Sequence, residues 1–243
     1  MRKFLLSILG LMALFIGVAS AAPTAPAADK KILIVLVGDS TVNDEGGWGY
    51  GFKKYLTGNV ACTNTAANGR SSKSFITEGR WDKALALKGD YYFIQFGHND
   101  EPGKGPDRET DPKTTYTQNL ARYVDETRAI GAQPILVTSL TRRNFDASGK
   151  LHPNLMPYVD AMKKLAAEKH VPLIDLHASS VELCEQLGPD KVAAFNPVKD
   201  GKPDTTHLAA GARIVFAGLV VADVRKTVPE LSPYLLAKPK LDQ

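Results

Sequence analysis

The sequence predicts a single α/β domain in which helices cover both faces of a parallel β-sheet, and three observations lead to this fold class. Residues 32–37 form an unbroken run of branched apolar side chains, the pattern of a strand that is buried on both faces. Further short apolar runs alternate along the chain with segments whose apolar residues recur at helical spacing. This alternation favours a doubly wound, five-stranded sheet with right-handed crossovers, arranged as three α/β/α layers.

The first half of the chain supplies three of the predicted strands. Each of them ends in a turn or loop that is rich in small and polar residues. In order, this half predicts a strand over 31–37, a helix over 48–56, a strand over 60–64, a helix over 73–78 and a strand over 91–96. Segment 101–112 is rich in Gly, Pro and charged residues, and we expect a long surface loop there.

The second half supplies two strands and four helices. The first helix ends at Gly131, and its expected inward face consists of Leu120, Tyr123, Val124, Thr127 and Ile130. A strand over 134–140 follows, and the next amphipathic helix carries Leu155, Val159, Met162 and Leu165. A strand over 171–176 precedes a helix that contains Cys184. The inward residues expected for the last helix are Leu208, Ala212, Val215, Phe216 and Leu219. The tail from Pro229 is expected to wrap the surface or to fray.

The amino-terminal residues predict an exported protein. Arg2 and Lys3 form a positive start, residues 4–18 are an apolar run, and residues 19–21 are the small residues that a signal peptidase requires. A membrane anchor is the competing interpretation, but the run is short for a span and no stop-transfer cluster follows it. We therefore expect a secreted or periplasmic protein with a secretory signal peptide over 1–21, a linker over 22–29 and a single folded domain over 30–243.

Composition and charge exclude several classes of partner. The 243 residues are 44% hydrophobic and 23% charged, which is enough to bury a sizeable core. The formal charge of +4 falls to about +2 without Arg2 and Lys3, which is too small to indicate a nucleic-acid partner. No other segment is long and apolar enough to span a bilayer, so we expect no membrane association after signal cleavage. The mature domain is expected to be a monomer.

Polar residues at the predicted strand ends point to acyl-transfer chemistry. Ligands of open α/β sheets bind at the carboxyl ends of the strands, where Ser40, Gly69 and Asn99 lie. A late loop adds Asp204 and His207, and a histidine oriented by an aspartate can take the proton of a serine hydroxyl. Each motif also has a purely structural interpretation, because such residues cap helices and form turns. Only their joint occurrence favours catalysis.

The same residues supply donors for an oxyanion. A tetrahedral intermediate needs hydrogen-bond donors aimed at its negative oxygen before the reaction begins. The backbone N–H groups of Ser40 and Gly69 can serve, and Gly69 has no Cβ to obstruct the substrate. The side-chain amide of Asn99 can supply a third donor.

These blocks resemble the SGNH, or GDSL-type, hydrolases, whose four sequence blocks contribute Ser, Gly, Asn and His in that chain order. The matching blocks are Gly38-Asp39-Ser40, Gly69, Gly97-His98-Asn99-Asp100 and Asp204-Thr205-Thr206-His207, and they span nearly the whole mature chain. Within this superfamily, segments 68–81 and 95–100 resemble the rhamnogalacturonan acetylesterases. Many relatives have Gly where this chain has His98.

The resemblance implies an esterase that removes acetyl groups from rhamnogalacturonan, an acetylated polysaccharide of plant pectin, with no metal or organic cofactor. It implies a flavodoxin-like strand order of 2-1-3-4-5. It also implies that Ser40 is the nucleophile, His207 the base and Asp204 its orienting partner, with oxyanion donors at Ser40, Gly69 and Asn99. Candidates for contacts with the sugar are Arg70, Arg80, Trp81, His98, Arg142 and Arg143. Each of these also has an interpretation as a surface charge or a core aromatic.

The two cysteines are expected to be free. Cys62 falls in the second predicted strand and Cys184 follows the fifth, and these strands are the two edges of a 2-1-3-4-5 sheet. The edges are roughly 19 Å apart at ~4.8 Å per strand spacing, whereas a disulfide needs Cα atoms within ~7 Å. We expect two free, buried thiols. No Cys/His spacing resembles a structural zinc site.

Alternatives of other kinds remain open at this point. An esterase acting on acetylated xylan, on another ester or on a thioester would use the same residues. A non-catalytic glycan-binding module could share the fold, although the intact Ser40, Asp204 and His207 argue against it. A nucleotide binder of the Rossmann type is disfavoured, because no Gly-x-Gly-x-x-Gly follows the first strand.

Overall fold

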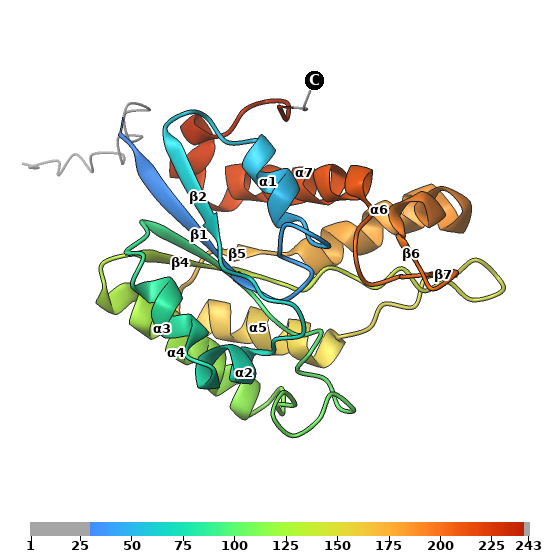
Figure 1. The fold of residues 1–243 in the computed structure, drawn as a ribbon, viewed down its shortest axis with the longest axis horizontal. Helices are drawn as coiled ribbons and strands as arrows, with labels where there is room; N and C mark the ends of the chain where they lie inside the picture. Colours follow the sequence, from blue (N-terminus) through green and yellow to red (C-terminus); the bar gives the residue numbers. More distant parts are fainter. Residues whose placement is uncertain (1–29, 241–243) are drawn as a thin grey trace, which may run out of the picture.

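Five parallel strands form the central sheet of the computed structural model, which describes residues 30–240 (Figure 1). The strands are β1 (Ile32–Gly38), β2 (Val60–Asn64), β3 (Tyr91–Gln95), β4 (Gln133–Val137) and β5 (Leu173–Ile174). Their spatial order is β2-β1-β3-β4-β5, which confirms the predicted fold class and strand order. The signal peptide and linker expected over 1–29 lie outside the described residues.

Strand β1 shows why a strand in this position is apolar on both faces. Ile34 and Leu36 pack into the core on one side of the sheet, and Val35 and Val37 pack into the core on the other. Successive side chains of a strand point to opposite faces, and β1 lies between two neighbouring strands. Helices cover both faces of the sheet, so both sets of β1 side chains are buried. This is why the apolar run of β1 is unbroken.

The helices form two layers on opposite faces of the sheet (Figure 1). One layer contains α1 (Gly49–Lys54), α6 (Leu176–Val192) and α7 (Ala210–Thr227). The other contains α2 (Ser72–Thr77), α3 (Arg80–Leu85), α4 (Thr115–Ala129) and α5 (Met156–Glu168). A short 3₁₀ helix, η1 (Ala193–Phe195), extends α6.

Two residues assigned to inward helix faces lie outside instead. Ile130 is 43% exposed because α4 ends at Ala129, before that position can turn toward the core. Val215 is 39% exposed, since the buried stripe of α7 runs through Ala212, Phe216 and Val220, one turn apart. The prediction that Ile130 and Val215 are buried was therefore wrong. Both residues lie at the edge of the helix face that the sequence predicted.

The carboxyl-terminal third contains the elements that differ most from the prediction. Strand β5 has two residues instead of six, because Pro172 offers no N–H and the Asp175 side chain already caps α6. A hairpin of β6 (Val198–Lys199) and β7 (Lys202–Pro203) was not predicted. Its turn residues Asp200 and Gly201 both have positive φ, and Asp-Gly is the sequence signal for such a two-residue turn.

The tail does not fray within the described residues. A 3₁₀ helix, η2 (Pro229–Tyr234), buries Leu231 and Tyr234 in the core, and Leu235 forms an antiparallel bridge with Leu56. The backbone N–H of Lys240 donates to the Lys54 carbonyl at 2.8 Å. The tail therefore runs along α1 as an ordered part of the domain.

The two cysteines agree in part with the prediction. Cys62 on β2 and Cys184 on α6 are both free, as expected. Cys184 is buried but Cys62 is only half-buried, so the prediction of burial was correct for one of them. Within residues 30–240, no helix has the length and apolar character needed to cross a membrane.

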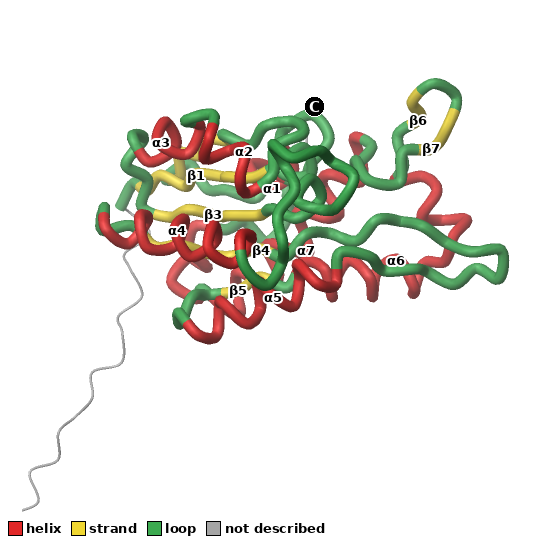
Figure 2. The backbone as a smooth tube through the Cα atoms, turned by 90° about the horizontal axis from the view of Figure 1, so that it is seen from below, coloured by secondary structure: helices red, strands yellow, loops and turns green. Residues whose placement is uncertain are grey.

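The loops that follow the strands gather at one end of the sheet. Figure 2 shows them beside the carboxyl ends of the strands, with the β6–β7 hairpin projecting away from the sheet. The parallel register brings Gly38, the last residue of β1, opposite Gln95 at the end of β3. Segments that are far apart in sequence therefore meet at this end.

Candidate active site

Ser40 lies in the turn after β1, and Asp39 organises that turn. The Asp39 Oδ1 atom accepts hydrogen bonds from the Thr41 backbone N–H at 2.8 Å and from the Thr41 hydroxyl at 2.7 Å. The Asp39 carbonyl accepts from the Val42 N–H at 3.1 Å. Asp39 thus holds the turn together, and the Ser40 hydroxyl takes no part in these hydrogen bonds.

The loop before α7 returns Asp204 and His207 to Ser40. The Nε2 atom of His207 lies 2.8 Å from Ser40 Oγ, and its Nδ1 atom lies 2.7 Å from Asp204 Oδ2. Asp204 Oδ1 also accepts from the backbone N–H groups of Thr206 and His207, at 2.9 and 3.0 Å. One carboxylate therefore holds both the imidazole and its loop, and the three predicted side chains form one chain of hydrogen bonds.

The direction of these hydrogen bonds follows from the charge of Asp204. Partial burial raises the pKa of Asp204, but hydrogen bonds from His207 and Thr206 outweigh it and lower the pKa to about 2. An ionised carboxylate can only accept, so the proton of the imidazole resides on Nδ1. Nε2 is then the acceptor that faces the Ser40 hydroxyl. In this arrangement histidine can act as a general base and aspartate can stabilise the imidazolium.

The predicted oxyanion donors lie on two neighbouring loops. Gly69 has a left-handed backbone with φ of 73°, a conformation that favours glycine. The Asn99 side-chain amide donates to the Arg70 carbonyl at 3.2 Å, which places it beside the Gly69 loop. The backbone N–H groups of Ser40 and Gly69 make no hydrogen bond to any described residue. Both are therefore available to a substrate oxygen.

A cavity of about 420 Å³ opens over this constellation. Its lining consists of Ser40, His98, Asn99, Glu101, Pro102, Lys104, Arg142, Thr206 and His207. Every lining residue except Pro102 is polar or charged. A hollow of about 470 Å³ near the amino ends of β3 and β4 has no serine or cysteine in its lining, so it offers no comparable nucleophile.

The family of the chain follows from a comparison of its sequence with known proteins. A family model described as GDSL-like Lipase/Acylhydrolase matches residues 36–214, which include Ser40, Gly69, Asn99, Asp204 and His207. The chain belongs to the GDSL-like lipase/acylhydrolase family. This confirms the resemblance drawn from the sequence and makes the chain a carboxylic ester hydrolase.

Named relatives and a solved structure agree with this family. Rhamnogalacturonan acetylesterase RhgT of Bacillus subtilis is 37% identical over 228 residues, which cover 86% of this chain and 96% of that protein. A rhamnogalacturonan acetylesterase of Emericella nidulans is 29% identical over 76% of this chain and 81% of its own. The crystal structure of Axe2, an acetylxylan esterase from Geobacillus stearothermophilus, shares the fold. Its TM-score is 0.62 at 17% identity, over 80% of this chain and 94% of that one.

The structure separates the candidate sugar-binding residues of this GDSL-like hydrolase. Trp81 is fully buried on α3, its indole N–H donates to Glu126 at 2.6 Å, and its ring packs against Tyr123. The expectation that Trp81 stacks on a sugar was therefore wrong. Arg70 and Arg80 both bind the Glu78 carboxylate, at 3.0 and 2.6 Å, and neither lines the cavity.

His98 lines the cavity but is itself buried. Its ring nitrogens have no hydrogen-bond partner among the described residues, and Nδ1 lies 3.8 Å from Asp39 Oδ2. Burial, and then the positive charge of Arg142, hold the pKa of His98 well below its usual range. The imidazole is therefore neutral and forms an uncharged wall beneath the cavity.

Arg143 supports the loop before α7, which carries Asp204 and His207. The sequence did not predict this role. The guanidinium is buried and donates to the His207 carbonyl at 2.5 Å and to Asn196 Oδ1 at 2.6 Å. The Arg143 backbone N–H donates to the Thr205 carbonyl at 3.0 Å. Burial lowers the pKa of Arg143 to about 10, so it remains charged at neutral pH. Arg143 is thus a positioning residue and not the sugar contact that we expected.

Replacing Arg143 with methionine is expected to lower kcat by about 10²-fold, because misplacing a catalytic group by about 1 Å costs this much. The measurement is the hydrolysis of an aryl acetate by Arg143→Met, Arg143→Lys and the wild type. Arg143→Lys should recover part of the loss, since an ammonium group can still donate to the His207 carbonyl. An unchanged kcat in Arg143→Met, in a variant that remains folded, would contradict the positioning role.

Asp100 fastens loop 101–112 to the sheet beside Asn99. Its carboxylate accepts from the Ser72 hydroxyl at 2.6 Å and from the Thr110 hydroxyl at 2.9 Å. The Tyr158 hydroxyl donates to the carbonyls of both Asp100 and Thr110, at 2.8 Å each. Burial raises the pKa of Asp100 to about 7 even though these hydrogen bonds oppose the rise. The loop bordering the cavity is therefore held at both ends.

The raised pKa of Asp100 predicts a pH-dependent term in stability. Folding raises this pKa from 3.8 to about 7, so the contribution is fully present below about pH 4 and is lost as the pH rises through about 7. We expect the free energy of unfolding of the wild type to fall relative to that of Asp100→Asn between about pH 4 and about pH 7, measured in urea. A difference that does not change with pH would contradict this assignment.

Proposed function

We propose that this chain is a serine esterase that removes acetyl groups from acetylated rhamnogalacturonan, with Ser40 as the nucleophile. The observation that carries the proposal is the chain of hydrogen bonds from Asp204 through His207 to the Ser40 hydroxyl at the edge of the cavity. The names of the two relatives, both rhamnogalacturonan acetylesterases, support the substrate.

The geometry supports a two-step acyl transfer. His207 Nε2 takes the hydroxyl proton while Ser40 Oγ attacks the acetyl carbonyl, and Asp204 stabilises the imidazolium that forms. The carbonyl oxygen becomes an oxyanion held by the N–H groups of Ser40 and Gly69 and by the Asn99 amide. His207 then protonates the sugar oxygen as it leaves. A water molecule, activated by the same imidazole, hydrolyses the acetyl-enzyme and restores Ser40.

The character of the cavity favours a short acyl group on a hydrated glycan. Its lining holds one apolar residue, Pro102, among polar and charged ones. A long acyl chain needs an apolar surface, because each buried CH₂ group gains about 0.8 kcal/mol only where water is excluded. An acetyl group on a hydroxyl-rich sugar does not need an apolar surface of this kind.

Acetate release from two polysaccharides side by side tests the proposal. The wild type is incubated with acetylated rhamnogalacturonan and with acetylated xylan at matched acetyl content. We expect faster release from the pectic polymer. Faster release from xylan would leave the esterase mechanism in place and overturn the substrate. Binding of either glycan with no hydrolysis of any acetyl ester would favour a glycan-binding module instead.

We also propose that the enzyme is exported through residues 1–21 and acts outside the cytoplasm as a monomer. A polymeric cell-wall substrate cannot enter a cell, which gives export a functional reason. Amino-terminal sequencing of the exported protein and light scattering of the purified domain test these two points. An unprocessed amino terminus or a stable dimer would contradict the corresponding part.

A further inference from the structure

Two cations on loop 101–112 border the active site without an acidic partner. Lys104 lines the same cavity as Ser40 and His207. Arg108 reaches toward the loop that carries Gly69. The Nη1 atom of Arg108 lies 3.8 Å from the point where a Cβ on Gly69 would stand. Among residues 30–240, neither side chain forms an ion pair. We call Lys104 and Arg108 the cationic pair.

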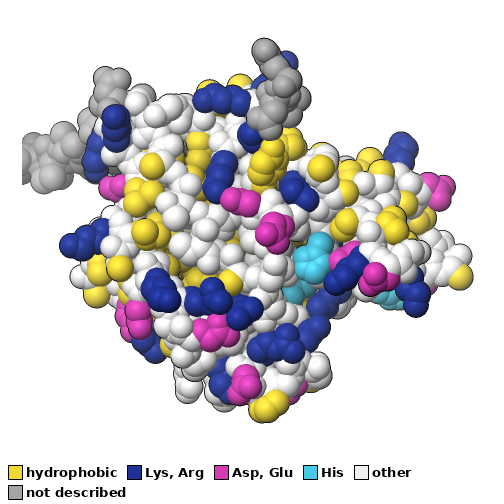
Figure 3. All heavy atoms as spheres, in the orientation of Figure 1, with side chains coloured by type: hydrophobic (Ala, Val, Ile, Leu, Met, Phe, Trp, Pro, Cys, Tyr) yellow, Lys and Arg dark blue, Asp and Glu magenta, His cyan; other side chains and the backbone are white. Residues whose placement is uncertain are grey.

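Neighbouring charges leave the cationic pair uncompensated. Glu101, the acid nearest to it in the cavity lining, is occupied by a bidentate contact with Arg142, at 2.6 and 3.1 Å. Glu109 accepts the Gly105 backbone N–H at 2.6 Å, and Asp107 is exposed on the outer part of the loop. Figure 3 shows Lys and Arg side chains gathered below the central histidine side chains on this face. The lining of the cavity therefore holds two cations, Lys104 and Arg142, against one carboxylate, Glu101.

Ordinary surface charges are mobile and solvated, but the Arg108 guanidinium and the backbone of loop 101–112 are held in place. Both side chains are half-buried, and the Arg108 Nε–H donates to the Lys104 carbonyl at 2.7 Å. From outside the loop, the Lys73 ammonium donates to the Pro106 carbonyl at 2.6 Å. The loop is also anchored through Asp100, as described above. A guanidinium fixed in advance loses less entropy on binding an anion than a free surface side chain does.

We propose that the cationic pair forms a carboxylate-binding subsite, which holds the acid group of a galacturonate residue of the polymer bound in the site. The proposal rests on the function proposed above and deepens it, because rhamnogalacturonan carries a carboxylate on each galacturonate whereas the xylan backbone is neutral. Arg108 can form charge-assisted hydrogen bonds with a carboxylate through the terminal N–H groups at the edge of its planar guanidinium. Lys104 adds a point charge on the cavity side. The subsite thus explains preference for an acidic polymer in terms of two residues.

The test compares a free-acid substrate with the same substrate made neutral. Acetate release is measured on acetylated rhamnogalacturonan and on the same polymer after methyl esterification, for the wild type, Lys104→Gln, Arg108→Gln and the double variant. We expect the ratio of kcat/KM on the free acid to that on the ester to fall about tenfold in each single variant and about a hundredfold in the double variant. Raising the salt concentration should lower the wild-type ratio as well, since partly exposed charges are screened.

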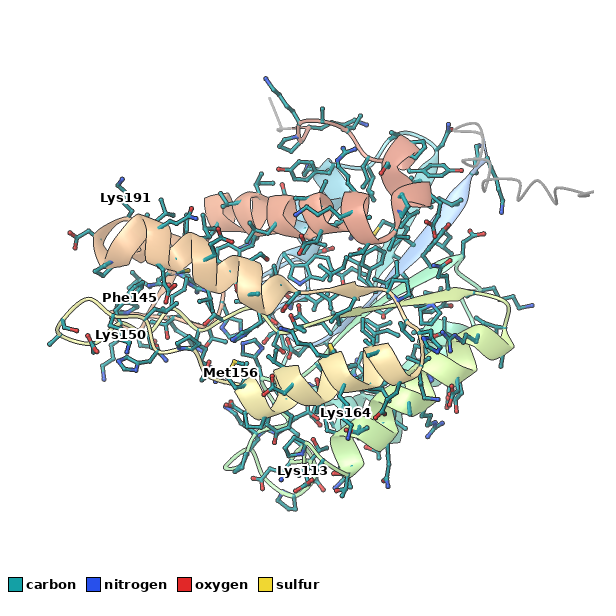
Figure 4. The ribbon with its side chains drawn as sticks, turned by 180° about the vertical axis from the view of Figure 1, so that it is seen from behind. Lys113, Phe145, Lys150, Met156, Lys164 and Lys191 are labelled. Atoms are coloured by element: carbon teal, nitrogen blue, oxygen red, sulfur yellow. The ribbon has the colours of Figure 1, made fainter. Side chains whose placement is uncertain are left out.

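Lys113→Gln provides the matched control, because it removes one lysine from the end of the same region. Lys113 is exposed and lines a separate hollow together with Lys164, between α4 and α5 (Figure 4). This variant should keep the wild-type ratio. A double variant that also keeps the wild-type ratio would overturn the subsite, even if its activity on both polymers fell.

Failure of the proposed function is recognised separately. If the wild type releases no acetate from either polymer, the substrate is wrong, and the subsite is measured by inhibition instead. Acetyl-free oligogalacturonate should then inhibit the hydrolysis of an aryl acetate by the wild type with a Ki about tenfold or more below that for the double variant. Equal Ki values would overturn the subsite independently of the natural ester.

Discussion

Replacing Ser40 with alanine is expected to lower kcat for acetate release by about 10⁵-fold, because loss of the nucleophile disables a triad almost as completely as loss of all its members. The oxyanion donors at Gly69 and Asn99 remain in Ser40→Ala, so a small rate above the uncatalysed reaction should persist. The measurement is single-turnover acetate release with enzyme in excess, which detects this residual rate.

Folding and contamination are the two controls for this result. Ser148→Ala serves as the matched variant, since Ser148 is an exposed loop residue whose hydroxyl contacts Asp146 and no other residue in the described part of the chain. It should retain wild-type kcat. The Ser40→Ala variant should unfold at nearly the wild-type denaturant concentration, because the Ser40 hydroxyl contacts only His207 among residues 30–240. Ser40→Ala with more than a tenth of wild-type kcat would refute Ser40 as the nucleophile.

Replacing Asp204 with asparagine is expected to lower kcat by about 10⁴-fold. An asparagine side chain can still accept the backbone N–H groups of Thr206 and His207 through its oxygen, so the loop keeps its shape. Its amide nitrogen then faces His207 Nδ1 and donates to it, which forces the imidazole proton onto Nε2. The imidazole can no longer accept the Ser40 proton, and it loses the carboxylate that stabilises its charged form.

Labelling by a serine-directed phosphonate distinguishes this electronic effect from a collapsed site. The rate of Ser40 labelling in Asp204→Asn should fall together with kcat, while KM for an aryl acetate changes little. An Asp204→Asn variant that keeps kcat within tenfold of the wild type would contradict the assigned role of Asp204. A large rise in KM would indicate a rearranged cavity instead.

Features that depend on local pattern could be predicted from the sequence. The apolar run of β1 marks a strand buried on both faces whatever lies around it, and it fixes where Ser40 stands. Parallel strands bring their carboxyl ends to one edge, so Ser40, Gly69 and Asn99 had to lie near each other once the fold class was assigned. The approach of His207 to Ser40 was a prediction from chemistry, and the structure brings the two side chains within 2.8 Å.

Features that depend on tertiary packing could not be predicted. A tryptophan near a strand end has equal reason to face a sugar or the core, and only the packing of α3 on α4 buries Trp81 against Tyr123. Arg142 and Arg143 are adjacent in the sequence and chemically identical, but their side chains point to different places. Arg142 faces the cavity, whereas Arg143 turns inward because buried carbonyls of the loop before α7 need a donor there. The spacing of residues in the sequence therefore does not predict where the side chains of Trp81, Arg142 and Arg143 lie.

The most direct test of the mechanism is detection of the acetyl-enzyme itself. The wild type and Ser40→Ala are mixed with excess aryl acetate, quenched in acid within one turnover, digested and examined by mass spectrometry. We expect the mass of one acetyl group on the peptide that contains Ser40 in the wild type, and no acetyl group on that peptide in Ser40→Ala. Turnover by the wild type with the acetyl group on a different residue, or undiminished turnover by Ser40→Ala, would contradict the central claim that Ser40 carries the acetyl group.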